Sequence, residues 1–152
     1  MELQNPVTYE SALFVAERMR EWDHREIYAT RWTEDPRVVA MDCAGAGSFS
    51  WCAGLEKPIA VIGAVPTWPG VWSVFMFATD DFRRISFSLT KFVKRVMIPA
   101  LRQTGAHRAE CCSIEGHEIA HRWLELLGAK QEGPTIEDYG RNRESFRRYV
   151  WR

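Results

Sequence analysis

The stretch VWSVFMFATDDFRRISFS, residues 71–88, decides the fold of this chain. Its first part, Val71–Ala78, is apolar at both alternating sets of positions, which predicts a strand buried on both faces. Two aspartates and two arginines follow, and small residues then open a helix. A buried strand that turns into a helix presents free backbone N–H groups to an anion, and arginine side chains strengthen such a site. We therefore expect an anion site at Arg83, Arg84, Ser86 and Ser88. The alternative is a serine N-cap beside two solvated arginines.

Further strands are expected on both sides of this stretch. Their apolar patterns are bounded by glycine, proline and polar turn residues. Residues 67–70 have the Pro-Gly order of a type II turn, so the strands before and after them should form a hairpin. Arginines in the last strand are typical of a protected sheet edge. The expected strands are Pro6–Tyr9, Ser48–Gly54, Pro58–Val65, Val71–Ala78, His107–Ser113 and Phe146–Trp151.

Helices are expected where apolar residues recur every three or four positions. Asp35 before Pro36 is a helix-start signal, and Gly128 is a helix-end signal. Pro99 lies inside the longest pattern, where it removes a backbone hydrogen bond and should kink the helix or end it early. The expected helices cover residues 12–22, 36–43, 89–101 and 118–127. This order of elements predicts a mixed sheet with helices on both faces.

The composition fits one domain with a sizeable core. The chain has 152 residues, 46% of them hydrophobic, with seven tryptophans and eight phenylalanines. Its 20 basic residues balance 20 acidic ones, which argues against a dedicated nucleic-acid-binding protein. No apolar run approaches the roughly 20 residues of a membrane span, and the first residues have no signal-peptide pattern. The four cysteines, with Cys111 and Cys112 adjacent, favour reduced thiols and a cytoplasmic location.

Two blocks of the sequence resemble the GNAT superfamily of acyl-CoA N-acyltransferases. The pair DF (81–82) followed by RxxSxS (83–88) is similar to the family's cofactor loop, in which glycine or alanine stands at the two serine positions. The block from CCS to LGA (111–129) is similar to the family's next strand and helix. The resemblance implies a single GNAT-like domain over residues 1–152, of the α/β (α+β) class. It also implies a mixed, mostly antiparallel sheet of six to seven strands.

The resemblance further implies an N-acetyltransferase that moves an acetyl group from acetyl-CoA to an amine of a small molecule or a protein. Backbone groups at the end of the central strand would pair with the pantetheine arm of the cofactor, as an added strand would. The cofactor-binding residues would be Phe77, Ala78, Arg83, Arg84, Ser86, Phe87 and Ser88. The candidates for proton relay are Glu56, Glu110, Ser113 and His117, and Asp23 and Glu26 would lie near the acceptor. For each of these the alternative is an ordinary solvated or strand-end residue.

The cofactor loop and the following helix depart from the family pattern. Ser86 and Ser88 narrow the close approach to a pyrophosphate that glycine allows, although their hydroxyls can donate to phosphate. The family's tyrosine, which protonates the departing thiolate, falls at Leu124, and leucine has no proton to donate. The proton must then come from another residue or from water, or no acetyl transfer occurs.

A non-catalytic role on the same fold is the main alternative. The segments Asp23–Tyr28 and His121–Glu125 resemble phage-encoded members of the superfamily, including small internal virion proteins of podophages. That resemblance implies a morphogenesis or internal virion protein, with virion proteins as partners and a location in the host cytoplasm or the virion. Ser86, Ser88 and Leu124 favour this alternative. Neither hypothesis implies a membrane or a dedicated nucleic-acid partner.

A third hypothesis starts from residues 117–121, His-Glu-Ile-Ala-His. This H-E-x-x-H motif places two imidazoles one helical turn apart, with a glutamate as a possible base, and predicts a zinc hydrolase. Glu137 or Glu144 would have to supply a third ligand. The helix should begin near Gly116, however, so His117 lies in its first turn rather than in its middle. Two exposed histidines on an amphipathic helix are the alternative, and no metal ligand is assigned from the sequence.

Overall fold

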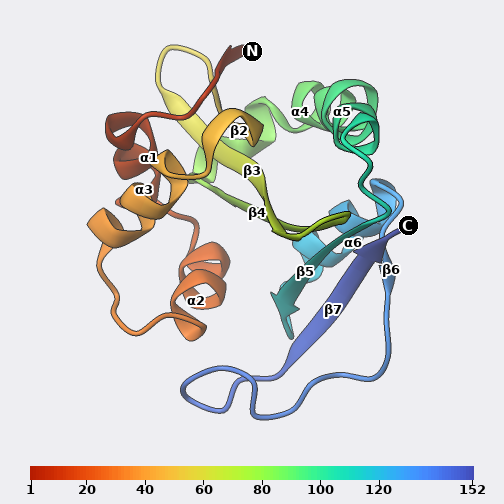
Figure 1. Ribbon diagram of the computed structural model, residues 1–152. Helices are drawn as coiled ribbons and strands as arrows, with labels where there is room; N and C mark the ends of the chain where they lie inside the picture. Colours follow the sequence, from red (N-terminus) through yellow and green to blue (C-terminus); the bar gives the residue numbers. More distant parts are fainter.

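Seven strands form one mixed sheet in the order β1-β2-β3-β4-β5-β7-β6 (Figure 1). The computed structural model describes all residues from Met1 to Arg152. Every neighbouring pair of strands is antiparallel except β4 and β5, which are parallel. The strands are β1 (Glu2–Gln4), β2 (Ser50–Gly54), β3 (Pro58–Trp68), β4 (Val71–Ala78), β5 (Arg108–Ile114), β6 (Lys130–Gln131) and β7 (Phe146–Trp151). The expected mixed, mostly antiparallel sheet is therefore confirmed.

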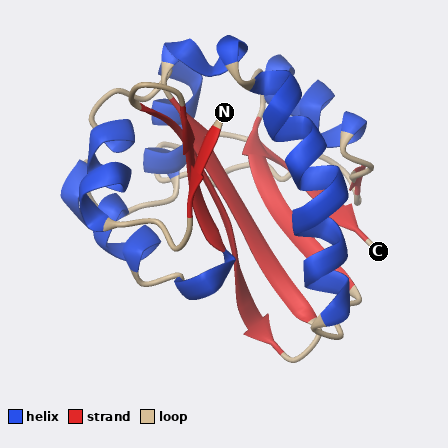
Figure 2. Ribbon diagram, turned by 90° about the horizontal axis from the view of Figure 1, so that it is seen from above, coloured by secondary structure: helices blue, strands red, loops and turns tan.

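Helices cover both faces of this sheet (Figure 2). On one face α1 and α3 bury Val15 and Val39 against Val61 of the sheet. On the other face α4, α5 and α6 enclose a core that includes Leu89 and Leu101. The helices are α1 (Tyr9–Ala16), α2 (Glu21–Ala29), α3 (Pro36–Ala44), α4 (Ser86–Phe92), α5 (Ile98–Gln103) and α6 (Glu118–Leu126), with 3₁₀ turns η1 (Gly47–Phe49) and η2 (Asp80–Arg84) and a π turn η3 (Val93–Met97). None of these helices is long and apolar enough to cross a bilayer.

Several boundaries follow from local chemistry. The strands Val71–Ala78 and Phe146–Trp151 cover the expected residues. Asp35 caps α3 by accepting a hydrogen bond from the Arg37 amide. Gly70 has φ +83°, a value that glycine adopts without strain and that the hairpin turn requires.

The expected strand at Pro6–Tyr9 is wrong. The Thr8 side chain accepts a hydrogen bond from the Ser11 amide, so Thr8 caps α1 and the helix begins at Tyr9. The first strand lies earlier, at β1, where it pairs with β2. Capping by a threonine therefore outweighs the weak strand pattern at this place.

The single helix expected over residues 12–22 is also wrong, because the helix is interrupted between the end of α1 at Ala16 and the start of α2 at Glu21. Met19 forms an isolated bridge with Thr79, and the Arg20 amide donates to the Ala78 carbonyl. These contacts hold the connecting residues against the end of β4. These tertiary contacts thus separate two helices where the apolar spacing alone predicts one continuous helix.

Two further expectations differ from the structure. Pro99 does not end its helix early, because α5 continues to Gln103. The π turn before the proline, in which the Ile98 amide donates to the Val93 carbonyl five residues back, interrupts the regular α-helix. The last strand, β7, is not a sheet edge, because Lys130 and Gln131 of β6 pair along its outer side. Its arginines therefore belong to an inner strand.

Candidate active site

The two parallel strands separate part of the way along. β4 and β5 pair only between Val71–Ser73 and Arg108–Glu110. Beyond these residues β5 turns away from β4, as Figure 1 shows. The remaining residues of β4, Val74–Ala78, have no strand partner on this side. We call this divergence the fork, and its closed end is the Ser73–Glu110 pair.

A cavity of about 380 Å³ occupies the fork. Its apolar side comes from α5 and α6 and includes Leu101, Trp123 and Leu124. Its polar side comes from α2 and from the segment before β7 and includes Glu26 and Tyr139. The cavity therefore suits a ligand with a long, mainly apolar arm whose reactive end meets polar groups.

The register between β3 and β4 decides which backbone groups face the fork. The Thr79 amide donates to the Ile59 carbonyl of β3. Phe77, two residues before Thr79, lies opposite Val61 of β3. Hydrogen-bonding direction alternates along an antiparallel strand, so Phe77 directs its backbone groups toward β3. The alternate residues of β4, among them Met76, direct their backbone N–H and C=O groups into the fork. The backbone groups of Phe77, expected to pair with pantetheine, therefore point toward β3 and not into the fork.

Ala78 faces the fork but already has partners there. Its amide donates to the Asp23 carboxylate at 2.8 Å, and its carbonyl accepts from the Arg20 amide at 2.8 Å. The same Asp23 carboxylate accepts two further bonds from the Arg20 guanidinium. The backbone groups of Ala78 are thus bonded to Asp23 of α2 and to Arg20, the residue before α2, and are not free for a ligand.

The expected arginines lie at the surface between β4 and α4. Arg83 and Arg84 are exposed in η2, and Arg84 forms an exposed pair with Glu56 at 3.4 Å. The residue at the N-cap of α4, Ile85, supplies no side-chain hydrogen bond to the first turn. The first-turn amides of α4 therefore lack a side-chain cap.

The residues expected to complete the anion site do not block it. The Ser86 hydroxyl donates to the Arg83 carbonyl at 3.2 Å, so it bends back onto η2. Ser88 is exposed, and the Phe87 side chain is 75% exposed. An anion could therefore approach the start of α4 from solvent.

Four of the expected site residues meet at the open end of the fork. Glu26 of α2 accepts hydrogen bonds from the Ser113 hydroxyl at 2.6 Å and the Ile114 amide at 2.8 Å. Asp23, on the same helix, binds the end of β4 as described. One carboxylate of α2 thus contacts each of the diverging strands. We call Asp23, Glu26, Ser113 and His117 the fork cluster.

His117 lies between the two carboxylates of this cluster and is 3% exposed. Its Nε2 atom is 3.6 Å from Asp23 Oδ1, and its Nδ1 atom is 3.6 Å from Glu26 Oε1. Its ring stacks on Trp22, with centroids 5.9 Å apart. The buried Nδ1 atom has no hydrogen-bond partner. Burial raises the pKa of Asp23, while its hydrogen bond and charge pairing with Arg20 oppose that rise.

Glu110 lies apart from the fork cluster, at the closed end of the fork. Arg108 donates to Glu110 at 2.7 Å and to both carboxylate oxygens of Glu132. These hydrogen bonds lower the pKa of Glu132 to about 2. The Glu110 side chain also lines the cavity and is 31% exposed. It is therefore a carboxylate held in place beside the cavity rather than a freely solvated one.

The cavity holds a tyrosine that sequence reasoning missed. Leu124, at the position of the family's tyrosine, lines the cavity, and Tyr139 also lines it. The ring of Tyr139 packs on Phe146, with centroids 5.1 Å apart. The residue is 43% exposed, and its hydroxyl is protonated at neutral pH because the pKa of a tyrosine is ordinarily about 10; partial burial raises this pKa further. No motif surrounds this residue, which lies in the segment between β6 and β7.

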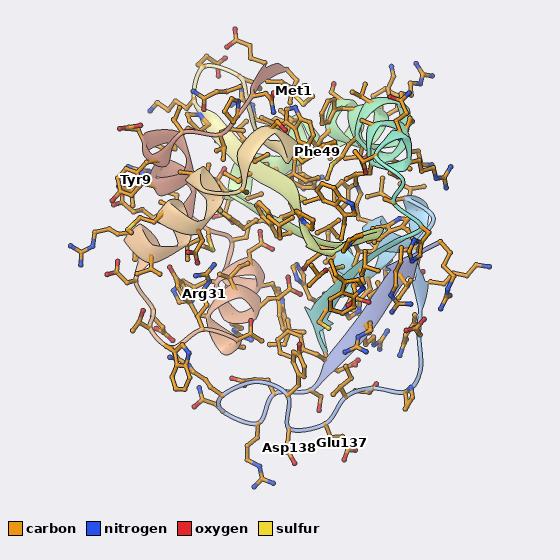
Figure 3. The ribbon with its side chains drawn as sticks, in the orientation of Figure 1. Met1, Tyr9, Arg31, Phe49, Glu137 and Asp138 are labelled. Atoms are coloured by element: carbon orange, nitrogen blue, oxygen red, sulfur yellow. The ribbon has the colours of Figure 1, made fainter.

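The zinc hydrolase expectation is wrong in its ligand set. His117 is the N-cap of α6 and lies outside the helix, so the four-residue spacing does not align it with His121. The His121 Nε2 atom faces the Ile114 carbonyl at 3.1 Å. Glu137 is exposed and points away from the sheet (Figure 3), and Glu144 accepts from a backbone amide of its own loop. Nor are the histidines exposed: both are buried.

Several solved structures with this architecture are described as acetyltransferases. No family model and no curated protein sequence matches the chain. A GNAT-family acetyltransferase from Bacillus anthracis superposes with a TM-score of 0.71 at 11% identity, over 98% of this chain and 92% of that one. Ard1 from Thermoplasma volcanium gives 0.73 at 10% identity, over 99% and 95%. The Salmonella typhimurium protein yncA, solved with its cofactor acetyl-CoA, gives 0.72 at 10% identity, over 100% and 93%. The chain therefore has the GNAT fold.

Proposed function

We propose that this protein is an acyl-CoA N-acyltransferase that uses the fork to hold the acyl donor. The observation that carries the proposal is the divergence of β4 from β5 after Ser73 and Glu110, with a cavity between the strands. This divergence leaves backbone groups of a buried strand without a partner, and such groups bind an extended amide-containing arm as an added strand would. The amides of a pantetheine arm have this chemistry. The likeness to acetyltransferases of the same fold favours acetyl-CoA as the donor.

The proposed donor site extends from the surface to the closed end of the fork. Arg83 and Arg84, with the uncapped first turn of α4, would hold the pyrophosphate. Val74 and Met76 would pair with the pantetheine arm, in place of the expected Phe77 and Ala78. The thioester would then lie near Glu110, among the polar groups of the cavity.

Acyl transfer forms an amide bond and breaks a carbon–sulfur bond, so the amine loses a proton and the thiolate gains one. Among the expected proton acceptors, Ser113 already donates to Glu26, and His117 is enclosed by the fork cluster. Glu56 is exposed, pairs with Arg84 and does not line the cavity. Glu110 remains, with Arg108 orienting it from the same strand. We assign proton uptake to Glu110 and proton donation to Tyr139, which replaces the tyrosine missing at Leu124.

The second candidate function is a non-catalytic one, as an internal virion or morphogenesis protein of a phage. Leu124 favours it, because the fold's proton donor is absent from its position on α6. Ser86 and Ser88 favour it as well, because they narrow the cofactor loop. This candidate predicts no response to acetyl-CoA, and virion proteins would be its partners in place of an amine acceptor.

Thermal unfolding with and without acetyl-CoA distinguishes the two candidates. A ligand at 100 times its dissociation constant adds about 2.7 kcal/mol to the free energy of unfolding. We expect acetyl-CoA to raise the melting temperature, and Arg83→Ala to abolish the rise. Arg102→Ala is the matched control, because Arg102 is exposed at the end of α5, away from the loop. No rise at millimolar acetyl-CoA in the wild-type protein would leave the non-catalytic candidate.

A further inference from the structure

The fork cluster holds more negative charge than positive charge. Glu26 receives its hydrogen bonds from neutral donors, the Ser113 hydroxyl and the Ile114 amide. The negative charge of Asp23 is paired with the positive charge of Arg20, whereas the negative charge of Glu26 has no arginine or lysine partner. The Asp23 side chain is 2% exposed and that of Glu26 is 15% exposed. A desolvated carboxylate without a cation is costly, so this arrangement calls for a bound positive charge.

His117 is directed into this site with an unused ligand atom. Its side chain is buried, and its Nδ1 atom faces Glu26 at 3.6 Å without a hydrogen-bond partner. A separation of 3.6 Å is too long for a hydrogen bond. Two ligand atoms bonded to one tetrahedral ion at about 2.0–2.2 Å lie about 3.3–3.5 Å apart. The three candidate ligand atoms, one from each of Asp23, Glu26 and His117, lie within 4.8 Å of one another.

We propose that Asp23, Glu26 and His117 form a binding site for a divalent transition-metal ion, Zn²⁺ in particular. One imidazole and two carboxylates suit zinc and its neighbours better than calcium or magnesium, which prefer oxygen ligands alone. Three protein ligands also leave a coordination position open, as in zinc sites that bind a further molecule. The proposal does not rest on the transferase function, although the three residues line the same cavity as the proposed donor site.

Groups around the three ligands hold them in place. Ser113 and the Ile114 amide orient Glu26, while Arg20 and the Ala78 amide orient Asp23. Hydrogen-bonded second partners of this kind fix the ligands of protein metal sites. Trp22 stacks on the His117 ring and leaves no room for a side chain at Gly116, where an added Cβ would lie 2.8 Å from the indole. The three ligands are therefore held near one another, and an ion would draw their atoms from within 4.8 Å to the shorter tetrahedral separations.

This site differs from the one that the H-E-x-x-H motif predicts. Only His117 of the motif takes part, and its partners come from α2, far away in the sequence. His121 faces the Ile114 carbonyl and is no member of the cluster. His121, a second buried histidine of the same motif, thus supplies a matched control.

The test is a titration of Zn²⁺ and Co²⁺ into the full-length, tag-free, EDTA-treated protein. We expect one ion per chain by calorimetry, a visible cobalt spectrum without a thiolate charge-transfer band, and a melting temperature raised by Zn²⁺. Glu26→Gln keeps the size of the side chain and should weaken binding by at least about tenfold. His117→Gln should do the same, while His121→Gln should bind as the wild type does.

Three results would overturn the metal site. The first is a wild-type protein that binds neither ion, which would mean that a proton balances the cluster instead. The second is loss of binding in His121→Gln, which would return the ligands to the motif. The third is a cobalt–thiolate band, which would assign the ion to cysteines. If His117→Gln fails to fold, the wild-type titration and Glu26→Gln still decide the question.

Discussion

At the scale of single residues, Tyr139 is the proposed proton donor in place of Leu124. It lines the fork cavity, and its hydroxyl is protonated at neutral pH, as the ordinary pKa of a tyrosine, about 10, requires. A general acid contributes about 10²–10⁴-fold to a rate, so we expect Tyr139→Phe to lower kcat by about 10²-fold or more. KM for acetyl-CoA should change little, because in the proposed mechanism the hydroxyl gives up its proton only as the thiolate leaves, in the transition state. The measurement is thiol release with the best amine acceptor of a panel.

Tyr9→Phe is the control for this variant. Tyr9 lies on α1 and is not among the residues that line the fork cavity (Figure 3). Its variant should keep the wild-type kcat. An unchanged kcat in Tyr139→Phe would instead assign proton donation to water.

At the scale of elements, the start of α4 decides how closely a pyrophosphate can approach. Each Cβ at Ser86 and Ser88 occupies space that glycine would leave free. We expect the double variant Ser86→Gly/Ser88→Gly to bind acetyl-CoA several-fold more tightly by calorimetry. The same variant should unfold more easily without ligand, because each glycine costs a helix about 0.5–1 kcal/mol. Affinity and stability would therefore move in opposite directions.

The double alanine variant at the same positions separates the two causes. It removes the hydroxyls but keeps both Cβ atoms, so it should not tighten binding. Equal tightening by alanine and glycine would show that the hydroxyls, rather than the Cβ atoms, obstruct the site. Weaker binding in both variants would mean that the hydroxyls donate to the phosphate.

At the scale of the whole molecule, Arg108 links β5 to the segment after β6 by binding Glu110 and Glu132. The folded-state pKa of Glu132, about 2, lies below its ordinary value of 4.5. Glu132 therefore stabilises the fold above pH 4.5, and this contribution is lost as the pH falls toward 2. We expect Glu132→Gln to be less stable than the wild type at pH 7, with the difference shrinking below pH 4.5. Urea unfolding across this pH range measures it.

Glu137→Gln is the control for this pH dependence. Glu137 is exposed in the same connection and forms no ion pair, so its substitution should leave the profile unchanged. A stability difference between wild type and Glu132→Gln that stays constant from pH 7 to pH 3 would contradict the role of the Arg108 pair.

The sequence by itself determined the local elements of this protein. The nearly continuous apolar run in Val71–Ala78 defines the central strand, Asp35 and Pro36 define the start of α3, and Gly128 defines the end of α6. These features depend on backbone preferences and caps within a few residues, which a sequence pattern records directly. The arginine loop between β4 and α4 could be located for the same reason.

Only the tertiary structure decided what these elements do together. Ser113 and Glu26 are 87 residues apart and meet because α2 lies across the ends of both diverging strands. The choice of Met76 over Phe77 as a residue facing the fork depends on the register with β3. The break between α1 and α2 depends on the contact of Arg20 with Ala78. Periodicity shows which face of an element is buried, but its partner is set by long-range packing, which no local pattern encodes.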